Sequence, residues 1–169
     1  MNRRGFTIVE LLIVIALMGI LLTLSVVNLH STQVNSRDTK RKTDLDTIAA
    51  QLEIFYKSGT DGSSTLGRYP STVELNSSTN IQANLRDADL KSFTPPGVAS
   101  ADVGFVAATN NLQGGTSVQP TPNTATYIYQ PLQQDETLCT TATQMCTKFN
   151  LYAKMESDGS IYMKTSKNQ

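Results

Sequence analysis

The chain has a strongly apolar start and a polar remainder. Between Phe6 and Val27 the clearly polar side chains are Thr7, Glu10, Thr23 and Ser25. An apolar stretch of about 22 residues is long enough to cross a bilayer as a helix. The remainder is rich in Ser, Thr, Asn and Gln, so we expect a small core built from short apolar clusters.

From Ser36 onward the pattern becomes that of an amphipathic helix. No Gly or Pro interrupts it before Gly59, and one apolar stripe recurs at intervals of three and four residues, at Leu45, Ile48, Leu52 and Phe55. We therefore expect one helix from Phe6 to about Lys57, roughly 78 Å long at 1.5 Å per residue. A globular domain of this size cannot bury that length, so the apolar half must meet lipid or other copies of the chain.

Alternating apolar and polar residues near the C-terminus predict three strands, at 125–132, 148–155 and 160–165. Asp158-Gly159 supplies a turn into the last of them, which predicts an antiparallel meander. The expected fold class is therefore α+β, with a long N-terminal helix packed on a small C-terminal antiparallel sheet.

The middle of the chain gives weaker signals. The residues from Gly59 to Pro70 have the composition of a loop, and Ser71 with Glu74 forms the pattern of a capping box that opens a short helix. We expect a further short helix at 81–90. Residues 95–124 are rich in Gly, Pro, Ser, Thr, Ala and Asn, so we interpret them as a variable surface segment that includes a strand at 103–107.

Charge and cysteine content narrow the classes of function. The 14 basic and 14 acidic residues balance, and the sequence has no basic patch of the kind that binds nucleic acid. The less favoured alternative is an aromatic surface that stacks DNA. Cys139 and Cys146 bound a short loop that follows an exported-looking segment, so we expect a disulfide outside the cytoplasm; the alternative is two unpaired buried thiols.

No catalytic, cofactor-binding or metal-binding constellation is recognisable. His30 is the single histidine and has no metal-ligand spacing to another His or to Cys. The sequence also lacks a G-x-S-x-G nucleophile motif and a phosphate-binding glycine loop. We therefore expect a structural protein without a cofactor, not an enzyme.

Glu10 is an unexpected acidic residue for a helix that crosses a membrane. A lone carboxylate in a membrane helix costs roughly 2.5 to 3.5 kcal/mol on insertion scales. The alternative to a specific role is a side chain that reaches the membrane interface from the helix end. No small-residue cleavage site of the A-x-A type follows the apolar run, which argues against an ordinary signal peptide and leaves a plain signal anchor as the alternative.

The run R-G-F-T-I-V-E that ends at Glu10 resembles the class III leader and mature start of type IV prepilins and type II secretion pseudopilins. The resemblance implies that a membrane prepilin peptidase and methyltransferase cleaves after Gly5 and N-methylates Phe6. It also implies that Glu10 contacts the Phe6 amine of a neighbouring subunit in the filament. Because either charge alone is penalised in a water-poor core, such a pair would select one axial register.

The resemblance divides the chain into a leader at 1–5, a transmembrane and filament-core helix at 6–29, an amphipathic half of that helix at 30–58 and an extracellular pilin domain at 59–169. It implies as partners other pilin subunits, an inner-membrane platform protein, an assembly ATPase and membrane lipid before assembly.

The expected location is the cytoplasmic membrane, with the N-terminus inside, and then an extracellular filament. One feature opposes this topology, because Arg37, Lys40, Arg41 and Lys42 follow the span on its outer side. We give more weight to the leader, because Asp38 and Asp44 dilute this basic cluster.

Two other functions remain open. A type II secretion pseudopilin would share the N-terminus; the missing calcium loop and the cysteine loop favour a pilus, whereas the lack of a proline before Pro70 favours a pseudopilin slightly. The third hypothesis is a signal-anchored extracellular binding domain that does not polymerise.

Overall fold

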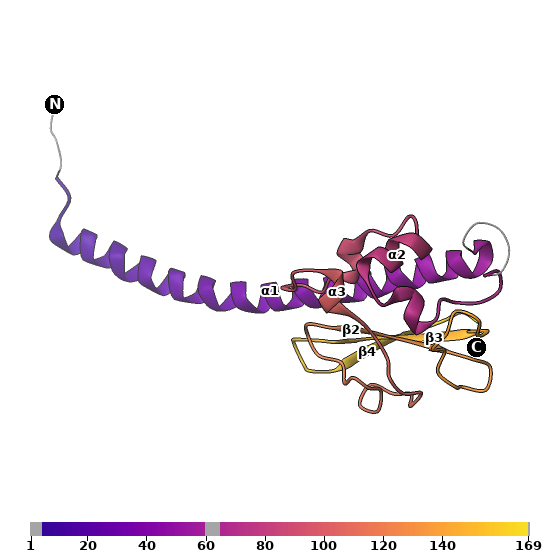
Figure 1. Ribbon diagram of the computed structural model, residues 1–169. Helices are drawn as coiled ribbons and strands as arrows, with labels where there is room; N and C mark the ends of the chain where they lie inside the picture. The colour runs from indigo at the N-terminus through magenta and orange to yellow at the C-terminus, as the bar shows by residue number, and fades with distance from the viewer. Residues whose placement is uncertain (1–4, 60–64, 169) are drawn as a thin grey trace.

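A single long helix dominates the molecule and projects far beyond the small domain that packs on its second half (Figure 1). The computed structural model describes residues 5–59 and 65–168, and at 25–28 it describes the backbone alone. Positions 1–4 of the predicted leader and positions 60–64 of the predicted loop lie outside the described residues.

Helix α1 spans Ile8–Ser58, close to the predicted bounds. Its 51 residues correspond to about 77 Å. The helix ends at Gly59, which has a φ of 64° and whose N–H bonds the Phe55 carbonyl at 2.7 Å. Glycine adopts this positive φ without steric cost. The helix passes through Gly19 without interruption.

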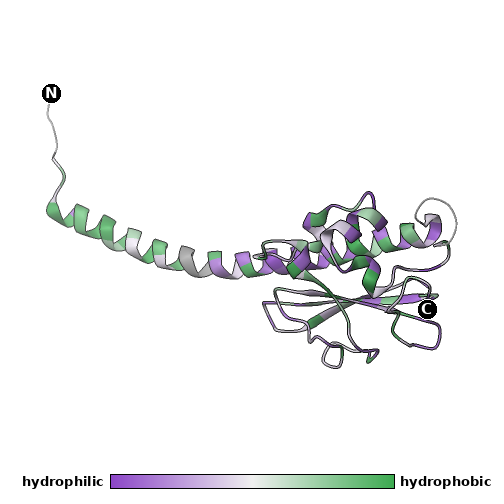
Figure 2. Ribbon diagram, viewed as in Figure 1, coloured by the Kyte–Doolittle hydropathy of each residue, from purple (hydrophilic) through white to green (hydrophobic). Residues whose placement is uncertain are grey.

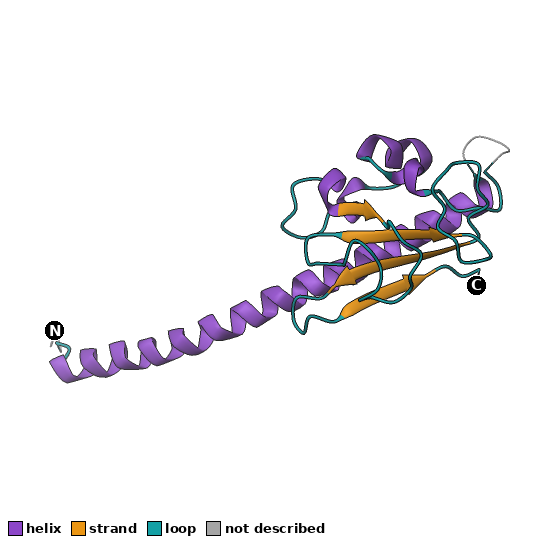
Figure 3. Cartoon of the chain, turned by 60° about the horizontal axis from the view of Figure 1, so that its bottom comes forward, coloured by secondary structure: helices purple, strands orange, loops and turns teal. Residues whose placement is uncertain are grey.

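Four strands form one sheet that lies along the second half of α1 (Figure 3). They are β1 (Phe105–Ala107), β2 (Tyr127–Leu132), β3 (Lys148–Lys154) and β4 (Ile161–Thr165), in that spatial order. The pairs β2–β3 and β3–β4 are antiparallel and confirm the predicted meander. The short strand β1 runs parallel to β2, so the sheet is mixed instead of wholly antiparallel.

Four short helical segments precede or adjoin the sheet: η1 (Thr72–Leu75), α2 (Ser78–Asn84), η2 (Leu90–Phe93) and α3 (Ala101–Gly104). The predicted capping box is present, because the Glu74 carboxylate accepts from both the N–H and the hydroxyl of Ser71 at 2.8 Å. The helix predicted at 81–90 was wrong in its bounds. It begins earlier because the Ser77 hydroxyl caps it by accepting from the Asn80 N–H, and it ends at Asn84.

The main core lies between α1 and the inner face of the sheet. The predicted stripe of α1 is buried there against Phe149, Leu151 and Ala153 of β3. The Phe149 ring meets the Tyr69 ring edge-on, with centroids 4.8 Å apart. This contact ties the segment after α1 to the centre of the sheet.

The outer face of the sheet carries a second, smaller core, formed by Ala108, Val118, Ile128 and Tyr152. The chain crosses this face between β1 and β2, which explains why the two strands run parallel. The interpretation of 95–124 as loose variable surface was therefore wrong for part of the segment, since Val118 is fully buried.

Gln130 is a fully buried amide on the interior strand β2, and it bonds the segment between β1 and β2 that crosses the outer face of the sheet. Its Nε2 donates to the carbonyls of Asn110 and Leu112 at 3.0 and 3.1 Å. Its Oε1 accepts from the Tyr152 hydroxyl at 2.9 Å and from the Asn150 amide at 3.1 Å. All the polar atoms of this side chain are therefore used.

We predict that Gln130→Ala lowers the free energy of unfolding by about 3 kcal/mol, because it leaves several buried polar groups without partners. Denaturant unfolding of the full chain in detergent measures this change. The control is Gln134→Ala on the exposed loop that follows, which should change stability by less than about 0.5 kcal/mol. Equal effects of the two changes would contradict the role assigned to Gln130.

Candidate assembly site

The N-terminal half of α1 has no cover within the chain. We call residues 6–33 the stem, and residues 34–59 together with 65–168 the head. Hydrophobic residues colour most of the stem green in Figure 2, and its large apolar side chains with a described position are 40–85 % exposed. By length and composition α1 contains a stretch that is able to cross a membrane, and none of that stretch is buried in the chain.

Glu10 lies in the first turn of α1, beside the predicted cleavage point. Its carboxylate accepts from the Thr7 N–H at 3.0 Å and from the Thr7 hydroxyl at 2.8 Å, while the Glu10 N–H donates to the Thr7 hydroxyl at 3.3 Å. This reciprocal pair is a capping box that satisfies backbone donors at the helix start. The sequence signal for this box is the pattern S/T-x-x-E, which begins at Thr7.

Gly5 and Phe6 precede α1 and are both exposed. The peptide bond between them lies outside the helix, where its backbone is open to another molecule. The predicted partner of Glu10, the Phe6 amine of a neighbour, belongs to a second chain, so this contact stays a prediction.

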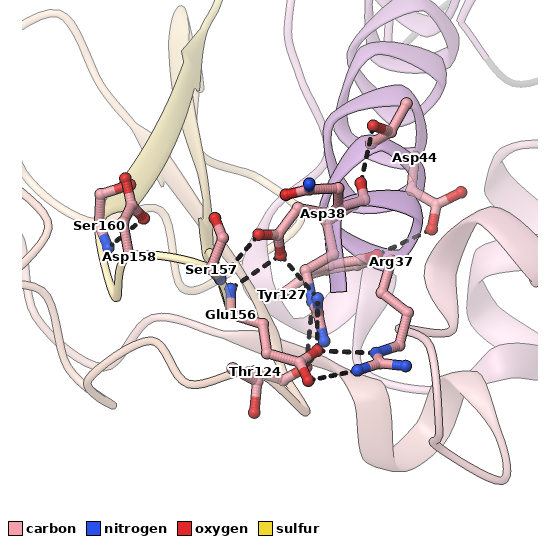
Figure 4. A network of polar contacts seen from close by, with 12 residues as sticks. Arg37, Asp38, Asp44, Thr124, Tyr127, Glu156, Ser157, Asp158 and Ser160 are labelled. Carbon is pink, nitrogen blue, oxygen red and sulfur yellow. Dashed lines mark hydrogen bonds and ion pairs between the residues drawn. The ribbon is translucent and has the colours of Figure 1, made fainter. Parts of the chain in front are cut away.

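A cluster of charged side chains lies where α1 leaves the head and continues as the stem (Figure 4). We call this place the exit of α1. Asp38 is 5 % exposed and lies between Arg41 of the same helix and the turn that joins β3 to β4. Its Oδ1 accepts from Arg41 Nη1 at 2.9 Å and from the Glu156 N–H at 2.8 Å, and its Oδ2 accepts from the Ser157 N–H at 2.9 Å.

A second group of contacts surrounds this centre. The Glu156 carboxylate reaches back to α1, where it accepts from Arg37 Nε at 2.8 Å and lies 3.4 Å from Arg41 Nη1. Arg41 also donates to the Thr124 carbonyl at 3.1 Å, and the Tyr127 hydroxyl donates to Asp44 at 2.8 Å. We call Arg37, Asp38, Arg41, Asp44 and Glu156 the exit cluster.

Every cation of the basic cluster noted in the sequence has a partner in the folded chain. Arg37 and Arg41 are paired in the exit cluster, Lys40 lies 2.7 Å from Asp44, and the Lys42 ammonium lies 5.8 Å from the centre of the Tyr162 ring. Glu156 is more than 100 residues away in sequence. The local sequence therefore could not reveal its part in this cluster.

The contacts in the exit cluster change the acidity of its groups. Burial favours the neutral carboxyl of Asp38, but hydrogen bonds from the backbone N–H groups of Glu156 and Ser157 and from Arg41 outweigh it and lower its pKa to about 2. A hydrogen bond from Arg37 lowers the pKa of Glu156. Burial and the hydrogen bond to Asp44 raise the pKa of Tyr127.

Cys139 and Cys146 form the predicted disulfide, with Cα atoms 5.9 Å apart, and both are buried. The carbonyls of the two cysteines accept from the N–H groups of Thr72 and Tyr69 at 3.0 and 2.7 Å. The Tyr129 hydroxyl fixes the same segment by donating to the Pro70 carbonyl at 2.6 Å. The disulfide loop thus holds the chain that follows α1 against the sheet.

Within the described residues, no group of three or more His, Cys, Asp or Glu side chains is arranged to hold a metal ion. His30 lies exposed near the end of the stem.

We predict that acid destabilises the head through Asp38. The pKa of Asp38 is 3.8 ordinarily and about 2 in the folded chain. The stabilisation from Asp38 is therefore complete above about pH 4 and is lost as the pH falls toward 2. Asp38→Asn should lower the free energy of unfolding at pH 7 and make that free energy depend less on pH. Denaturant unfolding of both chains from pH 7 to pH 2 measures this, and the two plots of free energy against pH should converge near pH 2. Parallel curves at all pH values would contradict this assignment.

Comparison with known proteins finds a family motif at the N-terminus and one similar curated protein. The profile described as the prokaryotic N-terminal methylation motif matches residues 1–26. The type IV major pilin protein PilA of Myxococcus xanthus is 34 % identical over 55 residues, which cover 32 % of this chain and 25 % of that protein. The aligned segment thus spans about a quarter of the relative's length.

No solved structure matches the chain. The N-terminal motif nevertheless confirms the resemblance predicted from the residues before Glu10, and the long helix followed by a small sheet confirms the predicted layout. The chain therefore carries a prokaryotic N-terminal methylation motif within a pilin-like α+β architecture, and a segment of 55 residues is similar to a type IV major pilin.

Proposed function

We propose that the chain is a structural subunit of a type IV pilus, cleaved after Gly5, N-methylated at Phe6 and polymerised by packing of its stem with the stems of other copies. The observation that carries the proposal is the bare apolar stem that contains Glu10 as its one acidic side chain. Lipid covers such a surface before assembly, and identical neighbours cover it afterwards.

The pairing of Glu10 with the Phe6 amine supplies the register in this proposal. The amine exists only after the leader is removed, so cleavage prepares the partner that Glu10 needs. Within the single chain the carboxylate is held by Thr7 at the very start of α1. It therefore lies one helical turn from the new N-terminus, where a neighbour's amine can reach it.

The proposal implies a defined path for the chain. The stem spans the cytoplasmic membrane with the N-terminus inside, and the head folds outside, where the disulfide is stable. A prepilin peptidase and methyltransferase processes the N-terminus, and a platform protein with a cytoplasmic ATPase drives assembly. Asp38 and Asp44 dilute the four cations that follow the span, and each cation has a partner once the head has folded outside.

A type II secretion pseudopilin is the second candidate, favoured by the absence of proline from α1. The similarity to a major pilin and the Cys139–Cys146 loop favour the pilus. A signal-anchored domain that never polymerises is the third candidate, and the processing measurement described next separates it from the other two.

We predict that Glu10→Ala leaves processing intact but prevents filament formation, because the neighbour's amine then has no partner. The chain is expressed in cells that carry a type IV pilus system. The mature mass should lack residues 1–5 and include one added methyl group. Electron microscopy of sheared surface material should show long fibres for the unmodified chain and for the control variant, but none for Glu10→Ala. The matched control is Thr23→Ala, since the Thr23 hydroxyl bonds the Ile20 carbonyl of its own helix.

An uncut leader, or cleavage at another bond, would exclude both filament functions. Normal fibres from Glu10→Ala would refute the register contact while leaving the processing result valid. Processing without long fibres from the unmodified chain would favour the pseudopilin.

A further inference from the structure

The direction in which the stem leaves the head is set by polar contacts. Among the described side chains of α1, the first fully buried apolar residue is Leu45. On the stem side of Leu45, charged residues of the exit cluster bond the turn after β3, the Thr124 carbonyl before β2 and the Tyr127 hydroxyl of β2. Apolar packing is not directional, whereas hydrogen bonds and ion pairs prefer a narrow geometry.

Asp38 holds the central place in this cluster because both of its carboxylate oxygens are used. It accepts from the N–H groups of Glu156 and Ser157, two successive backbone donors at the start of the β3–β4 turn. Backbone donors in a tight turn move less than the end of a long side chain. The turn is itself fixed, since the Met155 N–H bonds the Ser160 carbonyl at 2.8 Å and the Ser160 N–H bonds Asp158 at 2.9 Å.

A second set of contacts joins α1 to the β3–β4 turn, and here the turn supplies the carboxylate and α1 supplies the donors. Glu156 extends from the turn to Arg37, one position before Asp38 on α1, and to Arg41, one turn after it. Figure 4 shows the Glu156 carboxylate bonded to Arg37, while the Asp38 carboxylate meets the backbone of Glu156 and Ser157. The helix is therefore held from both sides of Asp38, and a rotation about this point must break contacts in either sense.

We propose that Asp38 is the positioning residue of the stem: its contacts with the β3–β4 turn fix the angle between α1 and the sheet at the exit point, so that a folded head presents the stem in one direction. This inference deepens the proposed pilus function and rests on it only where the fixed direction is taken to serve assembly.

Lever-arm geometry shows why this angle matters. From Asp38 to Ile8 the helix is about 45 Å long. A rotation of about 10° at Asp38 would move the first turn of α1 by roughly 8 Å. An ion pair requires its atoms within about 4 Å, so a loose exit would separate Glu10 from a neighbour's amine. A register contact at one end of the stem therefore needs a fixed angle at the other.

The test measures the stem direction in the unassembled full chain. Spin labels attached by chemistry that does not use cysteine, so that Cys139–Cys146 stays closed, are placed at the exposed positions Leu22 and Thr116. Double electron–electron resonance in detergent then gives the distribution of stem-to-head distances. We expect one narrow distribution for the unmodified chain and a distribution at least twofold wider, or shifted by several Å, for Asp38→Ala.

The matched control is Glu53→Gln, a change at another buried acid of the same helix. Glu53 accepts from the Tyr69 hydroxyl at 3.0 Å and from the Lys167 N–H at 2.9 Å, about four helical turns from Asp38. It should lower the melting temperature of the head yet keep the narrow distribution. If Asp38 only stabilised the head, the distance distribution would widen in both variants in proportion to the loss of head stability.

Asp38→Asn serves if Asp38→Ala does not fold, because the amide keeps one acceptor and should widen the distribution less. An unchanged distribution in a folded Asp38 variant would overturn the proposal, and so would equal widening by Glu53→Gln. Because no assembly is required, this result is independent of the filament test on Glu10. A narrow distribution with failed assembly would refute the proposed function without touching the inference on Asp38.

Discussion

One helix has to satisfy two different environments, and the rest of the structure depends on that constraint. The second half of α1 supplies one wall of the core of the head through Leu45, Ile48, Leu52 and Phe55. The first half exposes apolar side chains on all sides. Because the head is too small to cover a helix of about 77 Å, the stem must be covered by lipid or by other chains. Helix length and hydrophobicity together therefore support the proposal that other copies of the chain cover the stem after it leaves the membrane.

The exit cluster occupies the boundary between these two environments. Buried ion pairs contribute little net stability once desolvation is counted, but they select one geometry over its alternatives. At the exit of α1 such selectivity is useful, since a small angular error would be amplified along the stem. In the folded chain each of the four cations that follow the apolar stretch has a partner.

Local and periodic features were predicted well, and features that depend on distant contacts were not. The bounds of α1 and the three strands of the meander follow from side-chain periodicity, which the backbone geometry alone imposes. The parallel strand β1 and the buried Val118 depend on a segment that folds across the outer face of the sheet, where Gln130 binds its carbonyls. The composition of 95–124 indicated a variable surface segment because composition carries no information about those contacts.

The sequence by itself determined the apolar stem, the position of Glu10 after Gly5 and Phe6, the amphipathic stripe and the pair Cys139–Cys146. These features are readable because each depends on spacing within a short segment. Only the tertiary structure decided what Arg37, Asp38 and Arg41 do, since their partner Glu156 is more than 100 residues distant and is brought to them by the β3–β4 turn. The physical reason is that charge alone specifies no partner, and a partner is defined only when the fold brings donor and acceptor within hydrogen-bonding distance.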